Sequence, residues 1–322
     1  MRERRFNQRK FIYWKFVLVL PALTLLAIST KHLSVIQRAE LPRTTNSLTK
    51  FNDSEIMTAT HIHHESGFVF IMFVDEAFLK MTLSWICHAP NSVLAKTLFI
   101  VSSPDVQTSL KQFGAQHFKI ISMQSSKGRK KKSKIKYGQK AYYEVINLRA
   151  RLVSQLLHRQ LSVWIIESDS TWLADPTSVL ERFQNQDIVA GKDGEDQDEF
   201  PEAGFVFLNS TSRTRKLWDG MVTWQRNAID SMTRENAGDA GNEMLQLPEM
   251  LMQTNCTWSY FPASHFVSGK WYVSEKIRSS SSPIVIQNNW IVGTKHKIHR
   301  AQRWGHWYLH PSGHSCLLYR GS

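Results

Sequence analysis

The segment from Val163 to Pro176 constrains the fold more than any other part of this chain. Its sequence is VWIIESDSTWLADP, so a short apolar run passes directly into Glu167 and Asp169. Buried carboxylates are costly without a cation or hydrogen-bond donors, and ligands of open α/β sheets bind beyond the carboxyl ends of the strands. The segment therefore predicts a central strand of an α/β sheet that ends at a polar site.

Apolar runs of strand length alternate with helical stretches from residue 67 onward. The runs that predict strands are Phe68–Val74, Thr97–Val101, Phe118–Ile121, Val163–Ile166, Asp187–Ala190 and Gly204–Leu208. The stretches from Leu79 to Cys87 and from Gln139 to His158 predict helices. Such alternation is typical of a mixed, mostly parallel sheet flanked by helices, which is the α/β class that we expect.

A basic segment followed by an apolar one opens the chain. Met1 to Lys15 holds six Lys or Arg residues and one Glu, and fifteen uncharged residues separate Lys15 from Lys31. With Phe11 to Trp14 added, the apolar stretch reaches the ~20 residues that a spanning helix needs. Positive charge before the span predicts a cytoplasmic N-terminus and a lumenal body. A signal peptide cleaved near Ala27-Ile28-Ser29 is the alternative.

These features predict a cytoplasmic tail over residues 1–10, a transmembrane signal-anchor over 11–30, a polar stem over 31–66 and a lumenal domain over 67–322. Glycosylation sequons begin at Asn52, Asn209 and Asn255, as expected of a secretory protein. The three cysteines allow at most one internal disulfide, and their spacing matches no zinc site.

The strongly basic charge of the chain is confined to two segments. Of the net charge of +13, Met1 to Lys15 contributes +5 and Lys127 to Lys136 contributes +7, which leaves +1 for all other residues. This distribution gives little support to a nucleic-acid binder. The second segment is interpreted as a solvated loop or, alternatively, as a patch that steers an anionic ligand toward the site.

Glu167 and Asp169 have the spacing of a metal site. On an extended segment, side chains at positions i and i+2 point the same way, and oxygen ligands suit Mn²⁺ or Mg²⁺. The spacing fits equally a polar strand end that is capped by the next helix, which Asp175-Pro176 would begin. The residues alone leave both interpretations open.

Three segments together resemble a known family. VWIIESDSTWLADP, AGFVFLNST and IQNNWIVGTKHKI occur in the order seen in the nucleotide-diphospho-sugar transferase family, and are similar to glycosyltransferase family 77. The resemblance implies a GT-A-like nucleotide-binding fold and a single-pass type II Golgi membrane protein. It further implies Mn²⁺ or Mg²⁺, and retaining transfer of a sugar from a nucleotide-diphospho-sugar, a UDP-sugar, to a glycan or glycoprotein acceptor.

The resemblance assigns roles to residues of this chain. The Asp-x-Asp motif of the family falls on Glu167-Ser168-Asp169, so Asp169 becomes the main metal ligand and Glu167 replaces the usual Asp. Gln287 stands where the family has a His ligand. Lys297 would neutralise the leaving diphosphate, and Glu243 would contact the donor or acceptor sugar.

Four further residues are candidates for donor binding on the same basis. Asp75 would accept a hydrogen bond from the nucleoside and Arg149 would face the donor, while Gly204 and Gly293 would let the donor approach the backbone. Each has a structural alternative, such as a helix cap for Asp75 or an exposed helix position for Arg149.

Two interpretations remain open at the sequence level. The late tryptophans either stack on an acceptor sugar or pack in the core; they are Trp271, Trp290, Trp304 and Trp307. Because Glu167 and Gln287 depart from the family pattern, a catalytically weak or inactive lumenal member that binds a glycan or a partner is the alternative to an active transferase.

Overall fold

The computed structural model describes residues 54, 56–57, 67–113, 119–122, 138–193, 200–232 and 241–317. No helix in this part of the chain is long and apolar enough to cross a membrane. The predicted tail (1–10) and signal-anchor (11–30) lie outside the described residues, as do most of the predicted stem and the basic segment from 127 to 136.

The described elements follow one another in the order β1 (Phe68–Val74), α2 (Leu79–Ile86), α3 (Asn91–Ala95), β2 (Thr97–Val101), α4 (Pro104–Gln112), β3 (Lys119–Ser122), α5 (Lys140–His158), β4 (Ser162–Ile166), β5 (Ser170–Trp172), η3 (Thr177–Phe183), β6 (Ile188–Asp193), β7 (Phe200–Leu208), α6 (Ser212–Ser231), α7 (Glu243–Gln253), β8 (Trp258–Tyr260), β9 (Phe266–Val267), η5 (Gly269–Tyr272), α8 (Glu275–Ser279), β10 (Val285–Gln287) and α9 (Thr294–Arg303).

The main sheet has seven strands in the order β3-β2-β1-β4-β7-β6-β8. Its pairs are parallel except for β4 with β7 and β6 with β7, which run antiparallel. The predicted mixed, mostly parallel sheet flanked by helices is therefore confirmed. Strand β7 begins at Phe200, four residues before the predicted start, because Pro201 and Glu202 turn out to be buried in the strand despite their unfavourable residue types.

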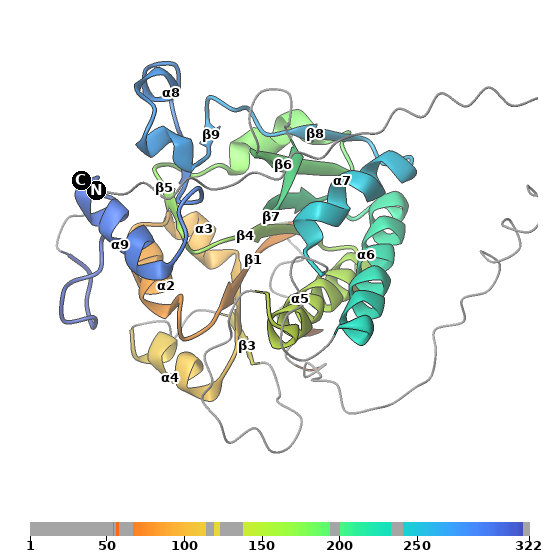
Figure 1. The fold of residues 1–322 in the computed structure, drawn as a ribbon, viewed down its shortest axis with the longest axis horizontal. Coiled ribbons are helices and arrows are strands. Elements are labelled where there is room, and N and C mark those ends of the chain that lie inside the picture. The colour runs from red at the N-terminus through yellow and green to blue at the C-terminus, as the bar shows by residue number, and fades with distance from the viewer. Residues whose placement is uncertain are drawn as a thin grey trace, which may run out of the picture. The chain divides into compact units, whose positions relative to one another are not determined.

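Helices cover both faces of the sheet because its strands are apolar on both sides. Alternate residues of β1 belong to different core clusters, with Val69 and Ile71 on one face and Phe70 and Met72 on the other. Helices α5, α6 and α7 pack on the first face, and α2, α3 and α4 on the second (Figure 1). Ile56, within the predicted stem, is also buried in the first cluster.

A second sheet of three short strands brings the late part of the chain to the end of β4. Its order is β5-β10-β9, with β10 antiparallel to β5 and parallel to β9. In this register Gln287 of β10 lies opposite Ser170 of β5. The backbone N–H of Asn288 then donates to the carbonyl oxygen of Asp169 at 2.8 Å. This small sheet therefore fixes the segment after β10 beside the acidic segment after β4.

A disulfide ties the segment after α9 to the end of α2. It joins Cys87 to Cys316, with their Cα atoms 5.4 Å apart, while Cys256 is a buried free thiol. Beside it, the ring of His88 stacks on Tyr308 with centroids 3.8 Å apart. The expectation of at most one internal disulfide is confirmed. The bridge holds the C-terminal segment against the second core cluster, which contains Cys87 and Leu309.

Candidate active site

A cleft of about 250 Å³ opens at the carboxyl ends of β1 and β4. It lies where an open α/β sheet places its ligands. Seven of the nine site residues predicted from the sequence line it; these are Asp75, Arg149, Glu167, Asp169, Gly204, Glu243 and Lys297. They come from β1, α5, β4, β7, α7 and α9, so the fold gathers residues that are more than two hundred positions apart in the chain.

The acidic segment after β4 forms the centre of the cleft. Glu167 directly follows the strand, whereas Ser168 and Asp169 form a turn, so the two acids do not lie on one continuous extended segment as predicted. Burial and the Asp169 carboxylate raise the pKa of Glu167, and Lys297 and Arg149 oppose that rise only in part. The cleft thus holds more negative charge than its cations neutralise.

Lys297 reaches the acidic segment from α9. Its ammonium group forms a salt bridge and hydrogen bond with the Asp169 carboxylate. Burial alone would lower the pKa of Lys297, but Asp169 and Glu167 raise it above its usual value. Lys297 is therefore a permanent positive charge in the cleft at neutral pH.

Gly204 in β7 makes room for Glu167. A Cβ atom at this position would lie 2.7 Å from both Cδ and Oε1 of the Glu167 carboxyl group. Real Cβ atoms do not approach other heavy atoms so closely, so any side chain here would displace the carboxylate. The glycine is required by the acid next to it.

Arg149 and Glu243 form a buried ion pair at the cleft wall. A guanidinium Nη2 of Arg149 bonds to Oε1 of Glu243, and both side chains are almost fully buried. Gln225 also approaches Glu243, with 3.4 Å between Nε2 and Oε2. The pair lies within electrostatic range of Glu167, which connects the cleft wall to its acidic centre.

Residues 92–301 match the model of the nucleotide-diphospho-sugar transferase family. The chain belongs to this family. The family resemblance drawn from the three sequence segments is thereby confirmed, and all three segments lie within the matched residues.

Two curated proteins are similar to this transferase. The chain is 25% identical over 190 residues to a UDP-galactose:fucoside alpha-3-galactosyltransferase from Dictyostelium discoideum. This match covers 54% of the chain and 29% of that protein. It is 24% identical over 203 residues to a beta-arabinofuranosyltransferase from Arabidopsis thaliana, which covers 56% of the chain and 37% of that protein. The chain thus spans about a third of the length of each relative.

Among solved structures, the chain is similar to the apo structure of the bifunctional glycosyltransferase WbbM. The TM-score is 0.45 at 12% sequence identity, and the match covers 74% of this chain and 51% of that one.

The remaining predicted residues of the transferase lie beside the cleft lining. Gln287 is buried in β10 next to Glu202, and its amide lowers the otherwise raised pKa of that acid. Gly293 precedes α9 with a φ of +95°, a conformation that favours glycine, and its carbonyl oxygen accepts from the N–H groups of His296 and Lys297. Its conformation sets the direction in which α9 carries Lys297 toward Asp169.

Asp75 occupies the end of β1 as predicted, but part of its carboxylate is already in use. Its Oδ1 accepts the backbone N–H of Phe78 at 2.9 Å, and burial raises its pKa above the usual value. The helix-cap and ligand-binding interpretations are therefore compatible, because one carboxylate oxygen serves the turn before α2 while the residue lines the cleft.

Within the described residues, no three His, Cys, Asp or Glu side chains converge in the manner of a metal site. The candidate oxygen donors are the carboxylates of Glu167 and Asp169, which both line the cleft, and the Gln287 amide in β10, which lies outside the lining. Glu202, a further acid next to Gln287, is almost fully buried, and its Oε2 has no hydrogen-bond partner.

Sequence reasoning missed the aromatic wall of the cleft and one buried acid. Phe73, Tyr142 and Tyr143 line the cleft, and burial raises the pKa of Tyr142 to about 12. Tyr142 stands seven residues, about two helical turns, before Arg149 on α5, so the helical period could have placed it on the same side of the helix. Glu202 carried a signal too, since it is an acid two residues before Gly204 in a strand.

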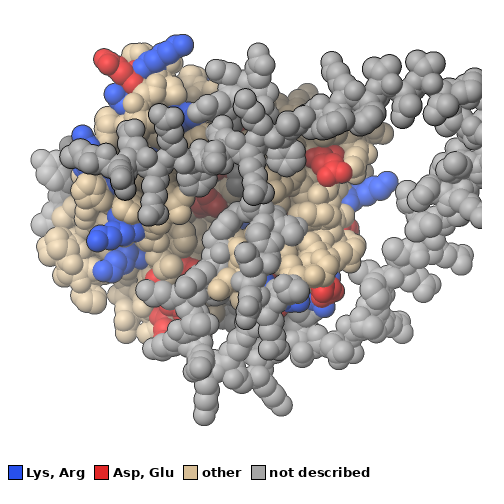
Figure 2. All heavy atoms as spheres, viewed as in Figure 1, with Lys and Arg blue, Asp and Glu red and all other residues tan. Residues whose placement is uncertain are grey.

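Basic side chains accompany Lys297 on α9. Lys295 and Arg303 of this helix are exposed, and Figure 2 shows Lys and Arg side chains gathered on the side of the molecule where α9 lies. Such a surface attracts anionic ligands toward the cleft at low ionic strength.

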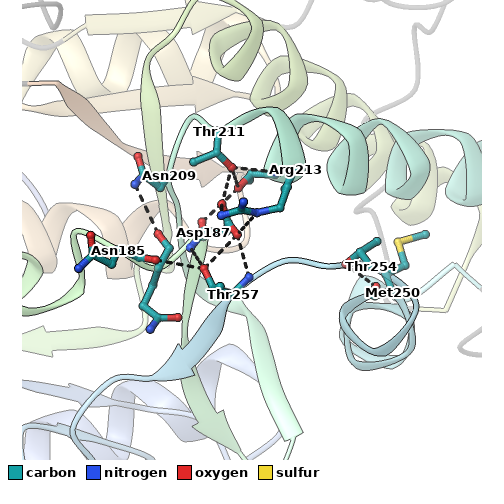
Figure 3. Close-up of polar contacts among 10 residues, drawn as sticks. Asn185, Asp187, Asn209, Thr211, Arg213, Met250, Thr254 and Thr257 are labelled. Atoms are coloured by element: carbon teal, nitrogen blue, oxygen red, sulfur yellow. Dashed lines mark hydrogen bonds and ion pairs between the residues drawn. The ribbon is translucent and has the colours of Figure 1, made fainter.

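The two sequons within the described residues meet at a buried acid far from the cleft. Asp187 accepts hydrogen bonds from Thr211, Arg213 and Thr257, and the last residues of both sequons are thus held in one cluster (Figure 3). The Asn209 side chain bonds with Ser162, whereas Asn255 is exposed. The sequon at Asn52 lies outside the described part of the chain.

Proposed function

We propose that this chain transfers a sugar from a nucleotide-diphospho-sugar, with a UDP-sugar as the expected donor, to a glycan or glycoprotein acceptor. The observation that carries the proposal is the convergence of Glu167, Asp169 and Lys297 in one cleft at the end of β4. Family membership and a UDP-galactose-dependent relative support the choice of donor class.

The cleft residues suit the parts of such a donor. Lys297 provides a fixed positive charge that would stabilise the departing diphosphate. Asp75, at the end of β1, would accept a hydrogen bond from the nucleoside beside the aromatic wall. Glu243, held in place by Arg149, would accept a hydrogen bond from a sugar hydroxyl, and Gly293 would admit a phosphate close to the start of α9.

The donor set also fits a divalent cation. The two neighbouring carboxylates and an amide oxygen are the hard ligands that Mn²⁺ and Mg²⁺ prefer. Burial, and after it the neighbouring acids, raise the pKa values of Glu167 and Glu202, and a bound cation would oppose that rise. Asp169, Glu167 and Gln287 would hold the cation, which would act as a Lewis acid toward the diphosphate. Lys297 then shares Asp169 with it.

Transfer would proceed with retention of the anomeric configuration. In the proposed step, the acceptor hydroxyl oxygen forms a bond to the anomeric carbon on the face from which the diphosphate departs. The bond from that carbon to the phosphate oxygen breaks, and the hydroxyl proton passes to the leaving diphosphate. No protein nucleophile is required, in keeping with Glu243 being engaged by Arg149.

The Golgi lumen is the proposed location, with residues 11–30 as a type II membrane anchor. The Cys87–Cys316 disulfide supports a secretory compartment, because structural disulfides form and persist in oxidising environments. The exposed Asn255 sequon agrees with the same compartment.

The proposal is tested by the release of UDP from UDP-sugars in the presence of the full chain, with Mn²⁺ or with EDTA. Wild type is expected to hydrolyse at least one donor slowly and to lose activity in EDTA. Asp169→Asn is expected to lower the rate by about a hundredfold or more. Asp219→Asn is a matched control, since Asp219 is half exposed and bonds with Ser154 and His158 away from the cleft.

Equal, background-level release in wild type and Asp169→Asn would contradict the enzymatic proposal. Calorimetric titration with UDP would then identify the alternative, a member of the family that binds in the lumen without turnover. Activity that survives EDTA but is lost in Asp169→Asn would support the proposed transferase activity and contradict the proposed divalent cation.

A further inference from the structure

The loop from Asn288 to Gly293, between β10 and α9, presents one tryptophan in an unusual way. Trp290 is 48% exposed, and its backbone φ is +58°. A left-handed backbone is rare for a bulky residue and is unfavourable where it occurs. Such conformations persist only where the surrounding structure enforces them, and they cluster at binding sites.

The residues before Trp290 are held firmly by side chains and backbone. Asn288 donates from Nδ2 to the carbonyl oxygen of Lys297 at 2.9 Å and accepts at Oδ1 from Arg300 at 2.6 Å. Asn289 accepts at Oδ1 from the backbone N–H of Gly269 at 2.5 Å. A Cβ atom on Gly269 would lie 2.0 Å from the Asn289 carbonyl oxygen, so only glycine fits there. The loop is thus clamped from both sides.

Packing does not explain this arrangement of Trp290. The rings of Trp271 and Trp304 pack together with centroids 5.2 Å apart, and Trp307 packs against the second core cluster. Trp290, in contrast, belongs to none of the core clusters of the described residues. The Nζ atom of Lys270 lies 4.3 Å from its ring centroid, so the indole makes a cation–π contact while almost half of the residue stays exposed.

The position of the loop relates Trp290 to the candidate active site. Asn288, two residues earlier, donates its backbone N–H to the carbonyl oxygen of Asp169, and Lys297, seven residues later, bonds to the Asp169 carboxylate. The ring is therefore carried by a segment that is fixed to the acidic centre of the cleft at both ends. Trp290 is not among the residues that line the cleft, so a ligand on its ring would lie outside the lining and beside this segment.

We propose that Trp290 is the stacking platform for a pyranose ring of the acceptor. The inference rests on the proposed glycosyl transfer. A pyranose offers an apolar face of C–H groups and a rim of hydroxyls, so it stacks on a flat indole while its rim stays in water. The strained, clamped backbone keeps the ring presented before the acceptor arrives, which lowers the ordering cost of binding.

Two variants and two readouts test this role. Trp290→Ala in the full chain is expected to raise the KM for transfer to a methyl glycoside by about tenfold or more, because the stacking surface is lost. Trp290→Phe should recover part of that loss. UDP release from the donor in the absence of acceptor should stay unchanged, since water replaces the acceptor in that reaction. Trp258→Ala is the matched control, because Trp258 is 37% exposed on β8.

Direct binding is measured by ¹⁹F NMR of the chain labelled with 5-fluorotryptophan. The methyl glycosides of galactose, glucose, mannose, fucose, xylose and arabinose serve as probes. The Trp290 resonance, identified by its loss in Trp290→Phe, is expected to shift with at least one of them, while the Trp258 resonance does not.

Three results would overturn the acceptor role. The first is that the Trp290 resonance does not shift with any of the six glycosides. The second is that the acceptor KM of Trp290→Ala is unchanged, and the third is that donor hydrolysis by Trp290→Ala falls as much as its transfer activity. A sedimentation coefficient that changes in Trp290→Ala would instead assign the exposed ring to a contact between copies. Absence of UDP release from wild type is a separate failure, since it removes the proposed function but leaves glycoside binding measurable.

Discussion

Two groups of buried acids in this molecule have opposite surroundings. Asp187, 1% exposed, accepts hydrogen bonds from Thr211, Arg213 and Thr257, and these bonds overcome the effect of burial and lower its pKa (Figure 3). Glu202, 3% exposed, gains only weak partners, and burial together with nearby Glu167 raises its pKa well above the usual value.

The difference separates an acid that is satisfied by its donors from acids in or near the cleft without enough donors. At Asp187 the donors come from the N-terminal end of α6 and from the residue before β8, so the carboxylate joins both segments to the start of β6. Glu167 and Glu202 are instead enclosed by burial and lie near other acids, and both effects raise their pKa values. A buried acid is thus best interpreted through its donors.

Asp187→Ala is expected to have the largest effect. Removing the carboxylate leaves the Thr211 hydroxyl and the Thr257 N–H without their acceptor, and each buried group left unpaired costs about 1–3 kcal/mol of unfolding free energy. Urea denaturation followed by circular dichroism measures the change, with the exposed Asp219→Ala expected within about 0.5 kcal/mol of wild type. A loss of less than about 1 kcal/mol in the free energy of unfolding of Asp187→Ala would contradict a stabilising role for the Asp187 cluster.

Gly204→Ala should damage the acidic cleft and spare the fold. The added methyl group would lie 2.7 Å from the Glu167 carboxyl carbon, so the carboxylate must move, and donor hydrolysis is expected to fall about 10–100-fold. Gly220→Ala is the matched control, because the nearest atom to its new methyl group is Met250 Cε at 3.9 Å and alanine favours the helix. Equal hydrolysis rates in the two variants would show that the position of the Glu167 carboxylate does not affect donor hydrolysis.

Glu202→Gln should have the smallest effect, and it should be stabilising. Because the pKa of Glu202 is higher in the folded state than in the unfolded state, the folded state binds its proton more tightly, and this contribution to stability falls as pH rises above the usual glutamate range. The amide has no such dependence. We expect a gain of about 1 kcal/mol at pH 7 and a smaller fall in Tm between pH 5 and pH 7 than in wild type.

Asp187 behaves with the opposite sign in the same titration. Its lowered pKa provides stability that is complete above the usual aspartate range and is lost as the pH falls through the folded-state value. Thermal melts from pH 3 to pH 7 in wild type and Glu202→Gln therefore separate the two groups. Identical Tm values for wild type and Glu202→Gln at every pH above 5 would mean that the pKa of Glu202 is not raised by its surroundings.

The sequence predicts the fold around the cleft where the pattern is local. The apolar runs predict the first and last residues of β1 and β2 as the structure has them. The acids after β4 likewise mark the carboxyl edge of the sheet in the sequence itself. Lys297 and Gln287 needed the family resemblance, because no spacing links them to Asp169, which is more than one hundred residues away.

The rest depends on packing that no local pattern encodes. Strands β5, β9 and β10 have two or three residues each, too few for a period to be recognised. The Arg149–Glu243 pair joins α5 to α7 across ninety-four positions, and only the packed helices bring it together. Asp187 read as an ordinary strand start, because its donors arrive from two later segments.

The disulfide between Cys87 and Cys316 has a consequence for biosynthesis. Its cysteines are 229 residues apart, so at the usual rate of translation Cys87 waits on the order of ten to forty seconds for its partner. Cys256 emerges earlier than Cys316 and could form a wrong bridge during that interval. Its burial and raised pKa keep it a protonated, poorly nucleophilic thiol once β8 has docked. Correct oxidation of this chain therefore depends on the order in which its cysteines become buried, and a Cys256→Ser chain should oxidise with fewer mispaired intermediates.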